Sequence, residues 1–159
     1  MYLASWRPYE EDINIPLLVR GPGVAAGSTT GKLALDTDYL PTFMDLAGTQ
    51  TPSYVDGRTL GSVLEGSVTP WRSAILLEGA AHYSPAYAGI RTIGIGGAPG
   101  RKYVEYSGKA RELYNLDLDP HEKTNQYFSS SPVADSLATR LRALEDCAGD
   151  ACFKAENGR

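Results

Sequence analysis

The stretch from Arg101 to Leu116 alternates polar and apolar side chains in two short runs. The runs are Lys102–Tyr106 and Arg111–Leu116, and they flank Ser107–Ala110, a glycine-bearing link of the length that joins antiparallel strands. This pattern predicts a β-hairpin. Because successive side chains of a strand point to opposite faces, one face of the hairpin is half buried and needs a cover.

Further elements on both sides of the hairpin complete a small domain. Ala74–Leu77 and Tyr87–Ile93 are predicted as two more strands. Downstream, Pro132–Cys147 is predicted as an amphipathic helix, with Ser131 as its N-cap and Gly149 past its end. Its apolar stripe consists of Val133, Leu137, Leu141 and Leu144. We therefore expect a small antiparallel sheet with one helix packed on it.

The first half of the chain predicts fewer elements and longer loops. Residues Ile13–Arg20 form an almost continuous apolar run, which is typical of a strand covered on both faces. Pro16 cannot donate to a strand ladder, so the strand is expected from Leu17 onward. A helix is expected after the cap cluster Asp36–Asp38, and Thr59–Leu64 should add one or two helical turns. The apolar positions of that first helix are Leu40, Phe43, Met44 and Ala47.

These early elements cannot bury their own apolar surface, because a lone strand has no ladder partner and one short helix has no layer to pack on. We interpret residues 1–70 as the tail end of a larger α/β layer. Residues 71–152 are interpreted as a subdomain of antiparallel sheet plus helix, and residues 153–159 as a tail. The predicted fold class is α/β, or α+β for this stretch by itself.

Composition excludes several functions. The 159 residues, 42% of them hydrophobic, suffice for the core of one domain. The formal net charge is −4, and 15 Lys and Arg residues are scattered among 19 acidic ones, so nucleic acid is not an expected partner. No apolar run approaches the roughly 18 residues of a membrane span.

Two glycine-rich stretches are similar to nucleotide-binding loops but have the wrong spacing. Gly27–Leu33 has three residues between its glycines and a leucine after the lysine, where a phosphate loop needs four residues and then Ser or Thr. Gly94–Gly96 is followed by Pro99 and a predicted strand, in place of a third glycine and a helix. Both stretches are expected to be ordinary loops.

Acidic residues gather at three places. Asp36 with Asp38 and Asp117 with Asp119 could suit a hard cation, but neither pair continues with the glycine and distal glutamate of a calcium loop. Both pairs precede prolines and fit capping or turn roles, so no metal is expected there. The trio Glu10–Asp12 is expected to be a solvated or salt-bridged loop, or else to orient a neighbouring cation or arginine.

The two histidines and two cysteines are the remaining candidates for chemistry. No serine or cysteine stands in a recognisable nucleophile elbow near either histidine, so no catalytic set can be assembled. His82, in a loop between two predicted strands, is a candidate to face a substrate, whereas His121 is expected in a turn. Cys147 and Cys152 are spaced to close a local disulfide, with two free thiols as the alternative. A disulfide would imply an oxidising compartment.

Several short motifs follow one another in a fixed order between residues 8 and 152. They are Pro8–Asp12, Ile15–Gly23, Thr37–Gly48, Asp56–Leu60, Trp71–Arg72, Leu76–Gly79, Arg91–Thr92, Lys102–Tyr106, Glu112–Leu116, Asp119–Pro120 with Glu122 and Asn125, and the pair Cys147 and Cys152. In this order and spacing the motifs resemble the C-terminal part of the sulfatases. The resemblance is strongest to the arylsulfatase and N-acetylglucosamine-6-sulfatase branch.

The resemblance implies an alkaline-phosphatase-like α/β layer followed by a small antiparallel sheet with a C-terminal helix. It also implies hydrolysis of a sulfate ester by a formylglycine hydrate, with a calcium ion polarising the sulfate. The family makes formylglycine from the first residue of a Cys/Ser-x-Pro-x-Arg motif, and neither Cys147 nor Cys152 is followed by that proline and arginine. The family's calcium carboxylates belong to an upstream segment, so this chain is expected to bind neither cofactor and to hold no catalytic residue. Ala4–Ser5 and Asn14 depart from the family's usual Gly-Lys and Arg.

Two functions are compatible with these observations. The first is a C-terminal fragment of an arylsulfatase-type hydrolase, whose sheet walls the cleft for an aryl or sugar sulfate ester. The second is a non-catalytic remnant or a carbohydrate-facing binding module. In either case the chain by itself is expected to be inactive. The family and the expected disulfide suggest a secreted, periplasmic or lysosomal location.

Overall fold

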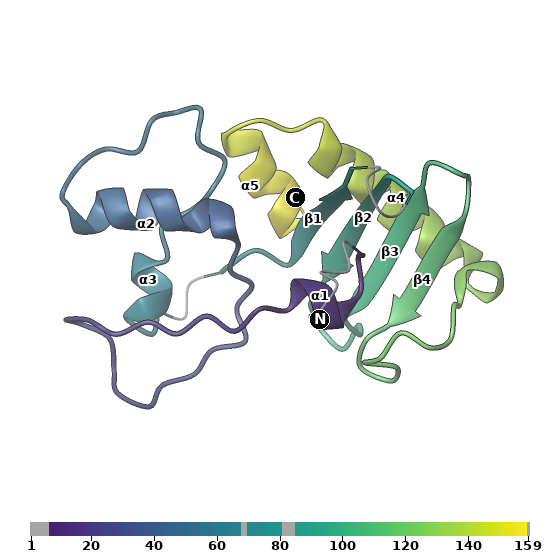
Figure 1. Ribbon diagram of the computed structural model, residues 1–159, viewed down its shortest axis with the longest axis horizontal. Coiled ribbons are helices and arrows are strands. Elements are labelled where there is room, and N and C mark those ends of the chain that lie inside the picture. The colour runs from purple at the N-terminus through teal and green to yellow at the C-terminus, as the bar shows by residue number, and fades with distance from the viewer. Residues whose placement is uncertain (1–6, 68–69, 81–84, 159) are drawn as a thin grey trace, which may run out of the picture.

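The computed structural model describes residues 7–67, 70–80 and 85–158 (Figure 1). A four-stranded antiparallel sheet with two helices behind it makes up one side of the molecule, and two short helices with long loops make up the other. The elements are α1 (Glu10–Ile13), the 3-10 helix η1 (Asp36–Asp38), α2 (Tyr39–Leu46), α3 (Gly61–Leu64), β1 (Ala74–Gly79), β2 (Tyr87–Thr92), β3 (Arg101–Tyr106), β4 (Arg111–Asn115), the 3-10 helix η2 (Tyr127–Ser129), α4 (Ser131–Glu145) and α5 (Asp150–Asn157).

The strands follow one another in the sheet in the order β1-β2-β3-β4. Ile90 pairs with Tyr103, and Tyr103 pairs with Leu113, so three large apolar side chains line up across neighbouring strands on one face. Lys109 has φ of +66° at the tip of the β3–β4 hairpin. The predicted hairpin and the two further strands are confirmed.

Helix α4 covers that apolar face of the sheet, as the sequence predicts. Leu137, Leu141 and Leu144 are buried and form one cluster with Ile90 and Tyr103. Full burial of a leucine side chain contributes about 1.5–3 kcal/mol, so this stripe is the main attachment of the helix. The helix begins at Ser131 with Ser130 as the N-cap residue, one position earlier than the sequence indicates.

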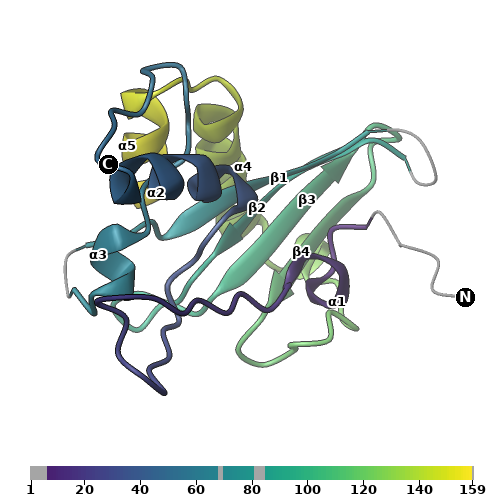
Figure 2. The same ribbon diagram turned by 60° about the vertical axis from the view of Figure 1, so that its left-hand side comes forward.

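The opposite face of the sheet is also covered, by the segment that contains α1 (Figure 2). The sequence predicts a loop at the acidic trio Glu10–Asp12, and the structure shows one helical turn instead. Pro8 is fully buried beneath this segment, and Val104 and Lys102 are buried on the sheet face that it crosses. The sheet is therefore enclosed between α4 on one side and the N-terminal segment on the other.

Helix α5 has no counterpart in the sequence prediction, which leaves the residues after Cys152 as a tail. The Cys147–Cys152 disulfide, with a Cα–Cα distance of 4.9 Å, ties the start of α5 to the end of α4. Gly149, at φ of +55°, makes the turn between the two helices, a conformation that costs other residues more than glycine. The predicted disulfide is confirmed.

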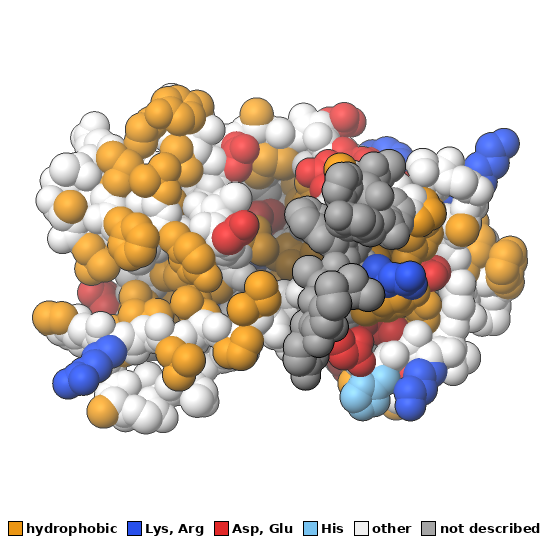
Figure 3. Space-filling model, in the orientation of Figure 1, with side chains coloured by type: hydrophobic (Ala, Val, Ile, Leu, Met, Phe, Trp, Pro, Cys, Tyr) orange, Lys and Arg blue, Asp and Glu red, His pale blue; other side chains and the backbone are white. Residues whose placement is uncertain are grey.

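The predicted strand from Leu17 onward is wrong. Residues 14–20 have no regular secondary structure, because no strand of the described chain lies beside them to form a ladder. Their apolar side chains face solvent, with Leu18 91% exposed. The helix expected after Asp36–Asp38 is confirmed as α2, yet its apolar face is also open, with Phe43 66% exposed. Figure 3 shows hydrophobic side chains gathered over the side of the molecule that contains α2 and α3.

One fully buried arginine joins the two sides of the molecule. The Arg72 Nη1 and Nη2 groups donate to the two carboxylate oxygens of Asp38, at 2.6 and 2.7 Å, and its Nε donates to Glu156 at 3.2 Å. Arg58 donates to the same carboxylate of Glu156 at 2.5 Å. Bidentate pairs of this kind fix orientation as well as distance, so η1, β1 and α5 are held at one point. The division into two parts near residue 70 stays a prediction.

Candidate functional site

The candidate site lies where α1 crosses the sheet, because charged side chains from four separate segments meet there. The Glu10 carboxylate accepts hydrogen bonds from Arg91 Nε and Nη2, both at 3.2 Å. Lys102 Nζ lies 2.9 Å from Glu10 Oε1 and 2.8 Å from Glu122 Oε1. We call Glu10, Arg91, Lys102 and Glu122 the clamp, since together they hold α1 on the sheet.

The side chains of the clamp are buried, so the pKa of each carboxyl depends on the neighbouring charges. The side chains of Lys102 and Glu122 are fully inaccessible to solvent, and Glu10 is 15% exposed. Burial opposes ionisation of Glu10, but the Arg91 and Lys102 cations outweigh burial and lower its pKa. Burial dominates at Glu122 and raises the pKa of that carboxyl despite its contact with Lys102. Removing one partner of such a buried group leaves the others uncompensated.

A second polar cluster extends the contact between the N-terminal segment and the sheet. The Tyr9 hydroxyl donates to Glu112 Oε1 at 3.3 Å, and the Tyr106 hydroxyl donates to Glu112 Oε2 at 3.0 Å. The Tyr9 and Tyr114 rings meet edge to face, with centroids 6.4 Å apart. Burial and the Glu112 carboxylate raise the pKa values of Tyr9, Tyr106 and Tyr114, so all three hydroxyls stay protonated and act as donors at neutral pH.

A cavity of about 370 Å³ opens beside the clamp, between α1 and the ends of β2, β3 and β4. Glu10, Asn14, Arg91 and Asp117 supply its polar lining. Its other walls come from Thr92, Ile93, Gly94, Gly100, Leu116 and Pro120. The volume falls in the range of small-molecule sites, about 300–1,000 Å³. The site therefore combines a rigid charged support with a recess of ligand size.

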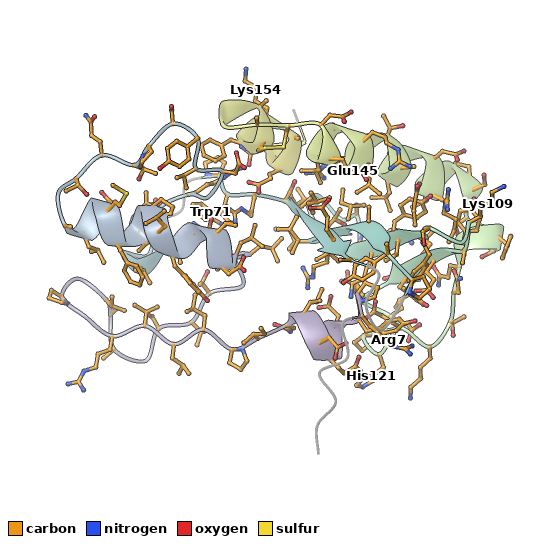
Figure 4. All side chains as sticks on the ribbon, turned by 45° about the horizontal axis from the view of Figure 1, so that its top comes forward. Arg7, Trp71, Lys109, His121, Glu145 and Lys154 are labelled. Atoms are coloured by element: carbon orange, nitrogen blue, oxygen red, sulfur yellow. A yellow bond between two sulfur atoms is a disulfide. The ribbon has the colours of Figure 1, made fainter. Side chains whose placement is uncertain are left out.

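The other candidate residues do not converge on this cavity. His82, the candidate substrate-facing residue, lies outside the described residues. His121 lies at the surface beside α1 (Figure 4), in agreement with a turn role. Its Nδ1 lies 3.2 Å from the carboxylate of Glu11. Asp38 is an ion-pair partner of Arg72, and Asp119 accepts the backbone N–H groups of Lys123 and Thr124. These two aspartates therefore act in structural pairing and in a turn.

The clamp contains two charged residues that sequence reasoning missed as buried groups. Lys102 belongs to a run that alternates polar and apolar residues. Alternation indicates which residues share one face of a strand, but it does not indicate whether another segment covers that face. Glu122 follows a turn and has φ of +52°, so it reads as an ordinary loop residue in the sequence. The one available signal was Glu10, for which pairing with a neighbouring arginine or cation was an open alternative.

The described residues do not fit the cofactors that the sequence resemblance implies. No group of three or more His, Cys, Asp or Glu side chains in residues 7–67, 70–80 and 85–158 could hold a metal ion. Both cysteines are joined in the disulfide, so neither is available for conversion to formylglycine. None of the helices in the described part of the chain is long and apolar enough to cross a membrane.

Comparison with known proteins gives a consistent result. The family model for the C-terminal part of N-sulphoglucosamine sulphohydrolase matches residues 6–146. The chain belongs to the sulfatase family. It is 30% identical over 177 residues to N-acetylglucosamine-6-sulfatase of Bos taurus, covering 91% of this chain and 31% of that protein. It is 32% identical over 148 residues to N-acetylglucosamine-6-O-sulfatase of Bacteroides thetaiotaomicron, covering 87% of this chain and 25% of that protein.

Solved structures agree on the sulfatase fold. The complex of BT4656 with its substrate D-glucosamine-2-N,6-O-disulfate has a TM-score of 0.65 and 26% sequence identity, and it covers 75% of this chain and 25% of that one. The phosphonate monoester hydrolase of Agrobacterium radiobacter has a TM-score of 0.56 and 28% identity over 68% of this chain and 24% of that one. This sulfatase chain thus spans a third or less of the relatives that it matches.

Proposed function

We propose that this chain is the C-terminal portion of a sulfuric ester hydrolase that acts on a sulfated sugar, and that it works only together with an α/β portion. Sulfatases generally depend on formylglycine and calcium, and the described residues here supply neither group. The α/β portion would therefore supply both, and this chain would wall the substrate cleft. The sulfated-sugar substrates of the bovine and Bacteroides relatives support the choice of substrate class.

The observation that carries the proposal is the open apolar surface of residues 15–19 and α2. Ile15 is 78% and Leu46 70% exposed, in addition to Leu18 and Phe43. A patch of this kind is costly in water and marks a surface that another layer covers. The covering layer would also give residues 17–20 the ladder partners that a strand needs. The clamp would hold this surface at a fixed angle to the sheet.

A chimera tests the proposal. This chain would replace the matched stretch of the Bacteroides thetaiotaomicron enzyme, and hydrolysis of N-acetylglucosamine 6-sulfate would be measured with calcium present. We expect the chimera to be active and the separate chain to be inactive. A chimera carrying Lys102→Met should lose activity, because the clamp no longer fixes α1, while Lys123→Met on the exposed turn should have no effect. A folded chimera without activity would contradict the proposal.

A further inference from the structure

We propose that the cavity beside the clamp is a subsite for an uncharged pyranose ring, the neighbour of the sulfated unit in the glycan chain. This inference rests on the proposed function and adds to it the part of the substrate that this chain would contact.

The polar lining offers hydrogen-bonding groups that are not used elsewhere. The Asn14 side chain has no hydrogen-bond partner among the described residues, and it is exposed at the cavity, where its amide can donate and accept. Arg91 binds Glu10 through Nε and Nη2, which leaves its Nη1 group. Asp117 accepts the Gly100 N–H through Oδ1 at 3.3 Å, which leaves Oδ2. An amide, a guanidinium edge and a carboxylate oxygen match the donors and acceptors of sugar hydroxyls.

The charge of the cavity decides between a neutral and a sulfated ring. Among the residues that line the cavity, Glu10 and Asp117 are acidic and Arg91 is basic. The formal balance is one negative charge, and the Arg91 guanidinium is already paired with Glu10. A sulfate group placed here would meet an unpaired like charge, so the site favours an uncharged ring.

The wall of the cavity that contains Gly94 and Gly100 is closely packed and carries no side chain at these two positions. A Cβ atom on Gly100 would lie 3.2 Å from both Asp117 Oδ1 and the Thr92 carbonyl oxygen, and one on Gly94 would lie 3.0 Å from the Ala98 carbonyl oxygen. The two glycines therefore let the loop between β2 and β3 fold tightly against the Asp117 turn. Leu116 and Pro120 add apolar surface for the C–H face of a sugar.

Titration of the 159-residue chain with N-acetylglucosamine and with its 6-sulfate, followed by amide chemical shifts, tests the inference. We expect saturable shifts at Asn14, Gly94 and Gly100 with the uncharged sugar and weaker binding of the sulfated one. Asn14→Ala should weaken binding of the uncharged sugar by about three- to tenfold, the effect of one lost hydrogen bond. Gln50→Ala, a matched amide on an exposed loop after α2, should change nothing.

A variant that removes one charge gives a second test. It is expected to increase affinity, and a folding defect would not produce an increase. Asp117→Asn keeps an oxygen for the Gly100 N–H, and it should strengthen binding of the 6-sulfate by about threefold, because one like charge a few ångströms away is removed. Shifts without saturation, shifts elsewhere on the chain, or equal affinity for both sugars would overturn the inference. An active chimera without sugar binding at the cavity would refute this inference alone, whereas sugar binding with an inactive chimera would count against the proposed function alone.

Discussion

Replacing Lys102 with methionine should destabilise the chain by about 3–5 kcal/mol, the cost of breaking a buried ion pair from one side. Methionine has similar length and fits the same space, so little packing is lost. Glu10 retains its two hydrogen bonds to Arg91, whereas Glu122 loses the one ion pair that it makes with described residues and stays buried. Most of the loss should therefore arise at Glu122. Urea unfolding followed by far-UV circular dichroism, with linear extrapolation, measures the change.

Two further measurements separate this explanation from a general packing defect. Lys123→Met, on an exposed side chain next to Glu122, should stay within about 0.5 kcal/mol of the parent chain. The Glu122→Gln change in the Lys102→Met background should recover part of the lost stability, because the uncompensated charge is gone. Recovery of less than about 0.5 kcal/mol, or a Lys102→Met loss below about 1 kcal/mol, would refute the reasoning.

The stability loss caused by Lys102→Met should depend on pH, and the pKa of Glu122 determines the direction. Burial already raises the pKa of Glu122 above its value in the unfolded chain, and loss of Lys102 should raise it further. A carboxyl with a raised folded-state pKa binds a proton more tightly in the folded chain. The free-energy cost of burying its negative charge is therefore absent below the unfolded pKa of about 4.3, and it grows as the pH rises from there through the folded pKa. The stability difference between the variant and the parent chain should therefore narrow as the pH falls toward 4.

Three other expectations concern the whole chain. Purified alone, with calcium and a chromogenic aryl sulfate, the chain should show no hydrolysis above background, and turnover that falls in His82→Ala would contradict this. Reduction of the Cys147–Cys152 disulfide should lower the unfolding free energy by about 2 kcal/mol by the loop-entropy relation, seen as a lower urea midpoint in dithiothreitol. In hydrogen exchange, the amides of β3 and β4 should be protected and those of Leu17–Arg20 should exchange fastest. Equal protection of Leu17–Arg20 and of the two strands would show that this segment has hydrogen-bond partners.

The elements that could be predicted from sequence are those whose pattern and partners lie close together in the chain. The β3–β4 hairpin needs only alternation and a short turn, and α4 needs only its leucine stripe. Helix α5 was missed because its eight residues give only about two turns of pattern and include no leucine. It is stabilised instead by tertiary contacts, the disulfide at Cys152 and the pairing of Glu156 with Arg72.

The candidate site was predictable only in part, for the same physical reason. The sequence marks Glu10 as a possible partner of an arginine, but it does not show that the arginine is Arg91, 81 residues away. Burial of Lys102 depends on whether a distant segment covers that face of the sheet. The strand expected at Leu17 was wrong because a strand requires neighbours, and an apolar run carries no information on whether they are present.

The long sequence separations within the clamp bear on how the protein is made. Synthesis proceeds from the N-terminus, and Glu10 can close its contacts only after Arg91, Lys102 and finally Glu122 have been added. The backbone N–H of Glu10 donates to Glu122 across 112 residues of chain. Until Glu122 has been made, the backbone N–H of Glu10 and the ammonium of Lys102 lack a carboxylate partner that compensates for their burial. Docking of the N-terminal segment on the sheet is therefore expected to be a late step in folding.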